Sequence, residues 1–213
     1  MIGLAGASCA SAPGGPGRTQ EVEWFRSGPY VGASIGISNS DASASDLDAD
    51  LAALGHTSSS TLDDTNEGWK LYAGYRLEQP FSIELGYVEL GEITSTISTT
   101  STDIEDFNAD VAEVHPFLGK GVYLAGQFSP LDRGPVEVGL RAGAWAWDAD
   151  VESKSAPAGD LDIDQDGVDP LIGLVVLFEL TRYLELRIEY EKYYQDDQDA
   201  DFLSAGVQVR RPR

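Results

Sequence analysis

The clearest pattern in the chain is an alternation of apolar and polar residues near its C-terminal end. In the segment 184–191, apolar Leu184, Leu186, Ile188 and Tyr190 alternate with charged Glu185, Arg187, Glu189 and Glu191. A period of two is the side-chain period of a β-strand, so the segment predicts a strand with one apolar and one charged face. A soluble sheet turns such a charged face to water, whereas a membrane barrel turns it to the lumen.

The same alternation recurs along the chain and predicts eight strands. They are Tyr30–Ser38, Trp69–Leu77, a strand starting at Phe81, Phe117–Phe128, Val136–Trp147, two strands within Asp169–Tyr193, and Phe202–Arg210. Short turns are expected at Glu78–Pro80, Ser129–Gly134 and Thr181–Tyr183. The other connections are polar: Asn39–Glu67, Glu92–His115 and Asp148–Gly167, which are long, and the medium-length Gln195–Asp201. In the first of them Leu47, Leu51 and Leu54 support at most one short piece of helix.

Long and short connections alternate, so all the long ones fall at one end of the predicted structure. A soluble sandwich has no reason for this arrangement, but an up-and-down membrane barrel has tight turns on one side and long loops on the other. The pattern predicts an all-β, eight-stranded antiparallel up-and-down transmembrane β-barrel over residues 28–210. Residues 1–27 are expected to be an export-signal remnant or a disordered leader, and residues 211–213 a tail.

Composition narrows the function. The longest apolar run, Leu171–Phe178, is far shorter than the roughly 20 residues of a membrane-spanning helix. The net charge is −22, with 36 acidic and 14 basic residues, which argues against a nucleic-acid partner because phosphate contacts need Lys and Arg. The polar connections hold most of the acidic residues and a single basic one, Lys154, so one end of the barrel is expected to be strongly acidic.

The inward face of the predicted barrel carries a set of charged residues: Lys70, Arg76, Glu84, Glu137, Arg141, Glu179, Arg187, Glu189 and Glu191. An isolated buried charge costs several kcal/mol, so these groups are expected to pair. The central cluster is expected to come from the middle of the strands: Glu84, Arg141, Arg187 and Glu189. A structural plug is favoured over a gate or narrow ion path, because eight strands leave room for side chains only.

Three details of the barrel stay open. Glu185 shares the charged face beside a turn, where it can reach water. Val175 and Leu177 also share it, so either the plug is partly apolar or this strand is bulged. Aromatic residues recur near strand ends, and those that face outward fit interfacial girdles. They are Tyr30, Trp69, Tyr75, Phe81, Tyr87, Phe117, Phe128, Trp147, Tyr183 and Tyr193.

One acidic stretch has possible metal chemistry. Asp162, Asp164 and Asp166 precede Gly167, as at the start of a calcium loop where alternate carboxylates converge on a hard cation. Gly173 stands where such a loop has its bidentate Glu. A Ca²⁺ site in the third long connection is therefore one hypothesis, and a solvated acidic loop is the other. The single cysteine excludes a cysteine-cluster metal site, and no other cofactor is expected.

Three segments resemble a known family: Gly28–Ser38, Leu140–Asp150 and Gly167–Tyr193 are similar to strands of the outer-membrane protein A-like eight-stranded barrel. The resemblance implies a small barrel in the outer membrane of a Gram-negative bacterium, with a structural or surface-interaction role. It also implies that Glu84 and Arg141 belong to a charged internal network. The expected partners are outer-membrane lipid, lipopolysaccharide and the barrel assembly machinery, and the expected state is a monomer.

The chain departs from that family in two ways. It ends after the eighth strand without a peptidoglycan-binding domain, so tethering to the cell wall is not expected. Its last residues, Val209 to Arg213, lack the aromatic end residue typical of the assembly signal.

Two other functions are alternatives to this interpretation. A soluble lipocalin-like barrel would bind a small apolar ligand, but it needs an apolar interior. An outer-membrane lipid-modifying enzyme would use His56 or His115 beside the serines of the long loops, which requires a defined Ser–His geometry.

Overall fold

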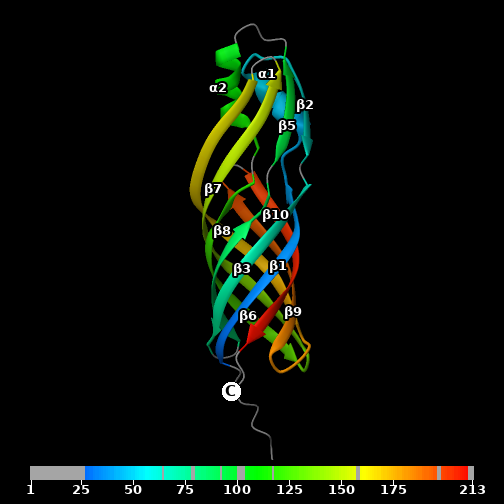
Figure 1. The fold of residues 1–213 in the computed structure, drawn as a ribbon, viewed down its shortest axis with the longest axis vertical. Coiled ribbons are helices and arrows are strands. Elements are labelled where there is room, and N and C mark those ends of the chain that lie inside the picture. The colour runs from blue at the N-terminus through cyan, green and yellow to red at the C-terminus, as the bar shows by residue number, and fades with distance from the viewer. Residues whose placement is uncertain are drawn as a thin grey trace, which may run out of the picture.

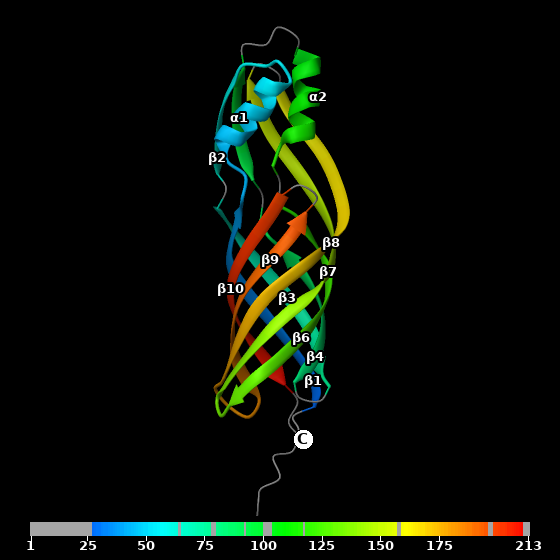
Figure 2. The same ribbon diagram turned by 180° about the vertical axis from the view of Figure 1, so that it is seen from behind.

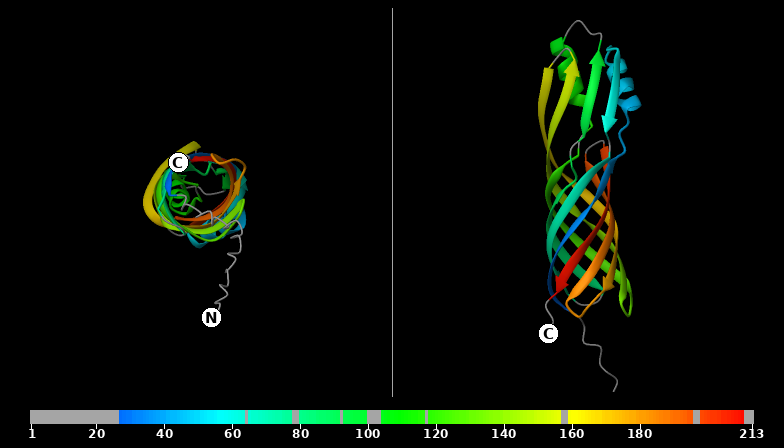
Figure 3. Two further views of the ribbon diagram at one scale, coloured as in Figure 1. Left: turned by 90° about the horizontal axis from the view of Figure 1, so that it is seen from below. Right: turned by 45° about the vertical axis from the view of Figure 1, so that its right-hand side comes forward.

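The computed structural model describes residues 27–63, 65–77, 80–91, 93–99, 104–116, 118–156, 159–195 and 198–210. Eight strands close into an antiparallel barrel along the long axis of the molecule (Figure 1; Figure 3). They are β1 (Gly28–Ser40), β3 (Thr65–Arg76), β4 (Phe81–Glu89), β6 (Lys120–Arg133), β7 (Val136–Ala156), β8 (Gly159–Glu179), β9 (Leu184–Gln195) and β10 (Gln198–Arg210). The ring runs β7-β6-β4-β3-β1-β10-β9-β8 and closes by pairing β8 with β7. The predicted fold class is confirmed.

The two ends of the barrel differ as predicted. The ends of β3 and β4, β6 and β7, and β8 and β9 that follow each other closely in the chain lie at one end of the barrel, which we call the turn end. The start of β1 and the end of β10 lie there too, since Tyr30 pairs with Arg210. The opposite, loop end holds everything between β1 and β3 and between β4 and β6, as Figure 2 shows from behind.

The strand alternation places apolar side chains on the outside of the barrel. Ile35 is 73% exposed, Leu85 56% and Leu140 54%, while their sequence neighbours face the lumen. A soluble protein does not leave such a continuous apolar belt in water, so this surface fits contact with lipid.

The loop end is a folded layer, and the prediction of long polar loops there was wrong in part. We call this layer the cap. It consists of α1 (Ala44–Ala53), β2 (Ser58–Asp63), β5 (Thr94–Thr99), α2 (Ile104–Val114) and the outer half of the β7–β8 hairpin. The hairpin continues the barrel ladder from Asp148↔Asp166 to Ser155↔Gly159. β5 then pairs in parallel with β7 and antiparallel with β2, which extends the hairpin into a small sheet (Figure 1).

Local sequence explains α1. Ser43 caps its start by accepting a hydrogen bond from the backbone N–H of Asp46. At its end, Gly55 has a φ of 98° and its N–H donates to Ala52, while the N–H of His56 donates to Leu51. These two bonds form a Schellman motif, which needs the left-handed conformation that glycine adopts without strain. The motif fixes where His56 leaves the helix.

The cap has its own apolar core. Leu47 and Leu51 of α1 pack with Ile97 of β5 and with Phe107 and Val111 of α2, and each is at most 2% exposed. In the described part of the chain, neither helix is long and apolar enough to cross a membrane. Helices of 10 and 11 residues are marginal by intrinsic propensity, so this core holds them in place.

Strand register and side-chain exposure decide three details of the barrel wall. The pairings of β8 with β7 and β9 are continuous at Val175 and Leu177, so the plug is partly apolar and the strand is not bulged. Glu185 is 3% exposed and does not reach water as suggested. Leu118, within the predicted strand Phe117–Phe128, precedes β6 and is buried at 4% exposure.

Candidate functional site

The centre of the lumen holds three basic and three acidic side chains. Lys70 comes from β3, Glu84 from β4, Arg141 from β7, and Arg187, Glu189 and Glu191 from β9. None is more than 2% exposed. β4 and β9 lie four strands apart on either path around the ring, so the cluster spans the lumen from wall to wall.

Every charge in this central cluster has opposite charges beside it. The Glu84 carboxylate receives Arg141 Nη2 at 2.7 Å and Arg187 Nη1 at 2.6 Å. Lys70 Nζ lies 2.5 Å from a carboxylate oxygen of Glu189 and of Glu191. Arg141 also pairs with Glu189, and its Nη1 lies 2.8 Å from Glu191. The predicted four-residue centre is brought together, and Lys70 and Glu191 join it.

Tyrosines complete the cluster, and the sequence interpretation had placed none of them there. Tyr30 and Tyr123 donate their hydroxyls to Glu84 at 3.0 and 2.7 Å, and the guanidinium of Arg187 lies 4.1 Å from the centroid of the Tyr72 ring. Tyr123 pairs across the strands with Gly86, where a Cβ would come within 2.5 Å of its ring. Such cross-strand glycines give the rings room to reach the lumen.

A second group of ion pairs lies nearer the turn end. Arg76 Nη2 pairs with Glu137 at 3.0 Å, and Arg210 bridges Glu179 at 3.0 Å and Glu185 at 2.9 Å. All the predicted lumen residues are thus paired. Arg210 was missed, although the alternation of β10 had already put it on the inward face.

An apolar layer lies between the central cluster and the cap. Trp145 of β7, Leu171 of β8 and Phe202 of β10 lie nearer the loop end, face inward and are completely buried. Leu90 and Tyr193 join them, and the rings of Trp145 and Tyr193 meet edge-on at 4.8 Å. Two chemically different layers therefore fill the lumen in series.

The aromatic residues predicted near strand ends fall into two groups, one facing outward and one facing the lumen. Trp69, Tyr75, Phe81, Phe128 and Tyr183 are exposed on the outer wall, where Trp69 packs on Tyr87 and Phe81 on Phe128. By contrast, Tyr30, Trp147 and Tyr193 are buried in the lumen. Phe117 lies outside the described residues.

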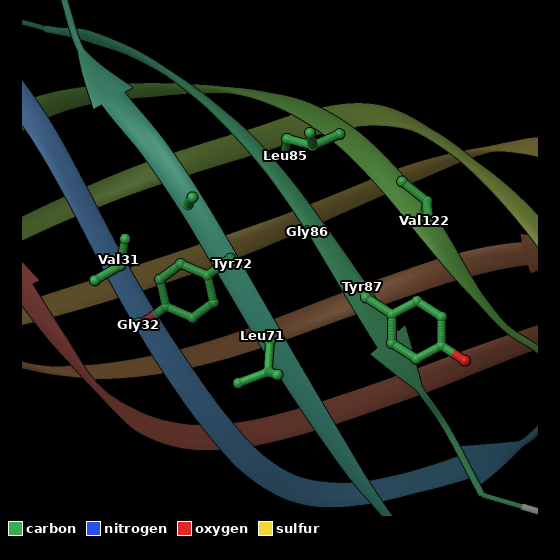
Figure 4. A pocket seen from close by; sticks show the side chains of 9 residues that line it. Val31, Gly32, Leu71, Tyr72, Leu85, Gly86, Tyr87 and Val122 are labelled. Carbon is green, nitrogen blue, oxygen red and sulfur yellow. The ribbon is translucent and has the colours of Figure 1, made fainter.

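A shallow apolar dent interrupts the outer wall between β1, β3, β4 and β6. Val31, Leu71, Leu85, Tyr87 and Val122 surround it (Figure 4). The small side chain of Ala73 forms part of its lining. An open apolar dent in a lipid-facing wall fits the packing of acyl chains and calls for no specific ligand.

The two histidines lie in or beside the cap. His115 Nδ1 donates to the carbonyl oxygen of Pro116 at 2.6 Å, which leaves Nε2 to accept the hydroxyl of Ser95 at 2.5 Å. Burial lowers the pKa of His115, so the ring is neutral. The geometry is that of a Ser–His pair, but Ser95 is 0% and His115 1% exposed, so no substrate reaches them. His56 pairs with Asp110, at 2.7 Å.

The proposed calcium ligands lie in a strand. The backbone of Asp162, Asp164 and Asp166 belongs to β8, not to the loop that the sequence predicted. Alternate Cα atoms of a strand stand roughly 6.6 Å apart, so the backbone here is extended and does not curve round as a calcium loop does. Asp166 is exposed, while the side chains of the other two lie outside the described residues. Calcium binding itself stays a prediction.

Comparison with known proteins gives the family. The model of the outer membrane protein beta-barrel domain matches residues 2–210. The chain belongs to this family. It is therefore an outer-membrane protein of a Gram-negative bacterium, and the soluble lipocalin-like alternative is set aside. The predicted resemblance to outer-membrane protein A-like barrels is confirmed.

Solved structures of outer-membrane barrels are similar to this family member. Neisserial surface protein A is 15% identical with a TM-score of 0.49, covering 86% of this chain and 97% of its own. Ail, the attachment invasion locus protein of Yersinia pestis, is 12% identical with a TM-score of 0.46, covering 86% and 99%. The N-terminal β-barrel domain of Pseudomonas aeruginosa OprF is 11% identical with a TM-score of 0.45, covering 84% and 97%. A comparison with curated proteins gave no match.

Proposed function

We propose that the protein is a non-enzymatic outer-membrane barrel with a closed lumen, whose acidic cap is its working surface on the outside of the cell. The observation that carries the proposal is the pair of filled layers in the lumen. Because the central cluster has three charges of each sign, its groups hold one another in place instead of attracting a mobile ion. An apolar layer in series opposes the passage of water and ions alike.

The cap supports the surface role. Its polar connections, including Asn39–Glu67 and Glu92–His115, hold a single basic residue, Lys154. Its own apolar core keeps this acidic surface in one shape, which suits recognition of a basic partner. Because β1 starts and β10 ends at the turn end, an exported chain would leave the cap outside. Outer-membrane lipid and lipopolysaccharide would surround the apolar belt of a monomer inserted by the barrel assembly machinery.

Conductance in planar lipid bilayers tests the closed lumen. The wild type is expected to show no channel, and Arg141→Ala alone is expected to stay closed because the apolar layer remains. Combining Arg141→Ala with Trp145→Ala and Leu171→Ala removes side chains from both layers and is expected to open a pore. Leu140→Ala, a neighbouring change on the lipid face, is the control. Each variant is first checked for the altered gel migration of an unheated folded barrel. A stable channel in the wild type would refute the plug.

A further inference from the structure

A histidine and two aspartates from the two halves of the cap meet at one point. His56 follows α1, whereas Asp106 and Asp110 lie one turn apart on α2. The imidazole nitrogen and one carboxylate oxygen from each aspartate all lie within 4.8 Å of one another. Residues one helical turn apart face the same way, so both carboxylates point at the ring.

The position of His56 is fixed from several sides. The Schellman motif at the end of α1 directs the backbone, as described above. The ring meets Phe107 edge-on at a centroid distance of 5.1 Å, and its Nε2 lies 2.7 Å from Asp110 Oδ2. The His56 side chain is only 7% exposed, and that of Asp110 is 22% exposed. A buried imidazole held against carboxylates is a preorganised donor set and not a loose acidic patch.

We propose that His56, Asp106 and Asp110 form a binding site for a divalent transition ion of the Zn²⁺ type, which joins the α1 half of the cap to the α2 half. One nitrogen and two carboxylate oxygens are ligands that Zn²⁺ accepts, whereas Ca²⁺ and Mg²⁺ prefer oxygen alone. Ligands about 2 Å from a tetrahedral ion stand roughly 3.3 Å apart, so small rotations of the carboxylates complete the geometry. Asp106 is exposed, which leaves a fourth position open to water.

The alternative is a simple contact between His56 and Asp110 without a metal ion. The two models differ in their need for Asp106, because the metal site uses its carboxylate as a ligand and the simple contact does not.

The test is titration of ZnCl₂ into the full-length protein in detergent micelles, followed by calorimetry and by competition with a chromogenic chelator. The wild type is expected to bind one equivalent saturably at neutral pH. The variants His56→Gln, Asp106→Asn and Asp110→Asn are expected to weaken Zn²⁺ binding by at least about 10-fold, as loss of a ligand should. Asp50→Asn is the matched control, since it removes the same charge from an exposed position of the cap, on α1.

Three further measurements keep the test independent of overall charge and of folding. Gel migration of the unheated protein shows that each variant still forms the barrel. In the wild type, Zn²⁺ should also slow proteolysis of the cap, and chelation should reverse this effect, while Asp106→Asn should not respond. X-ray absorption of the bound zinc should report a nitrogen ligand that is absent in His56→Gln. The proposal is overturned if the wild type shows no saturable binding, if Asp50→Asn loses as much affinity as Asp106→Asn, or if His56→Gln binds normally.

Discussion

The central cluster and the cap are both rich in acidic residues, but these residues are buried and paired in the cluster and exposed to water in the cap. In the lumen, Glu84, Glu189 and Glu191 are almost fully buried and each touches at least one basic group. In the cap, acidic residues far outnumber the basic ones, and Asp46 and Asp50 remain exposed. A carboxylate cut off from water needs a partner, whereas one in water is already solvated. The central cluster is therefore held together by ion pairs, and the cap is held together by apolar contacts despite its charge.

Hydrogen bonds to hydroxyls replace ion pairs in the cap. Asp48 accepts the hydroxyls of Ser58 and Ser60 at 2.8 and 2.7 Å and also the backbone N–H of Ser60. Partial burial acts to raise the pKa of Asp48, but these hydrogen bonds lower it overall. The serines of β2 thus tie α1 to the edge of the cap sheet, where no basic residue is at hand among those the structure describes.

The largest effect is expected from Arg141→Ala. The change leaves Glu84, Glu189 and Glu191 with fewer positive partners in a dry site and should lower the free energy of unfolding by about 3–5 kcal/mol. Urea-induced unfolding in lipid vesicles measures this loss. Arg182→Ala deletes the same side chain at an exposed turn and should cost less than about 1 kcal/mol. Equal losses of unfolding free energy in the two variants would show that burial does not explain the effect of Arg141→Ala.

A smaller and local effect is expected from Leu51→Ala. Leu51 is completely buried in the cap core. Its truncation should destabilise the cap by about 2 kcal/mol, near the low end for such changes because the layer can relax. Protease digestion of the cap should accelerate, while the gel migration of the unheated barrel stays as in the wild type. Leu54→Ala, at an exposed position after the same helix, should leave the digestion rate unchanged. Loss of the barrel in Leu51→Ala would mean that the two regions fold as one unit.

The smallest effect is expected from acidification. Burial depresses the pKa of His115 below its ordinary value of 6.5, so an unfolded cap binds a proton there more readily than a folded one. The cap should therefore keep its whole stability above about pH 6.5 and become less stable as the pH falls toward the pKa that His115 has in the folded cap. Digestion rates at about pH 7.5 and pH 5 measure this loss, and His115→Gln should reduce the difference. An identical response in both proteins would remove His115 as the cause.

The barrel was predictable because its strands must satisfy two different environments. Lipid on one face and a crowded lumen on the other force an alternation that is visible in any segment, such as Leu184–Glu191. That alternation also assigned Glu84, Arg141, Arg187 and Glu189 to one cluster before their contacts were known. It did not find the hydroxyl of Tyr30, because a tyrosine near a strand end fits a girdle as well as a lumen.

The cap escaped prediction for a physical reason. Strand β5 has one buried aliphatic residue, Ile97, and β2 consists mainly of Ser and Thr. Neither strand therefore shows the alternation of apolar and polar residues that predicts the barrel strands. Strand β2 pairs with β5, and β5 pairs with the outer half of the β7–β8 hairpin, so each partner lies far along the chain. Helix α1 shows only Leu47, Leu51 and Leu54, enough for a short helix but silent about what it packs on.

By itself, the sequence determined the number of barrel strands, the inward and outward faces of most of their residues, the end at which the acidic residues collect, and the membrane that the chain enters. These follow from short-range periodicity and from the solvent on each side of a strand. Tertiary structure alone decided which charges meet across the lumen, that an apolar layer lies in series with them, and that His56 comes to lie against α2. Those contacts join residues from distant strands and loops, and only ring closure brings them within reach.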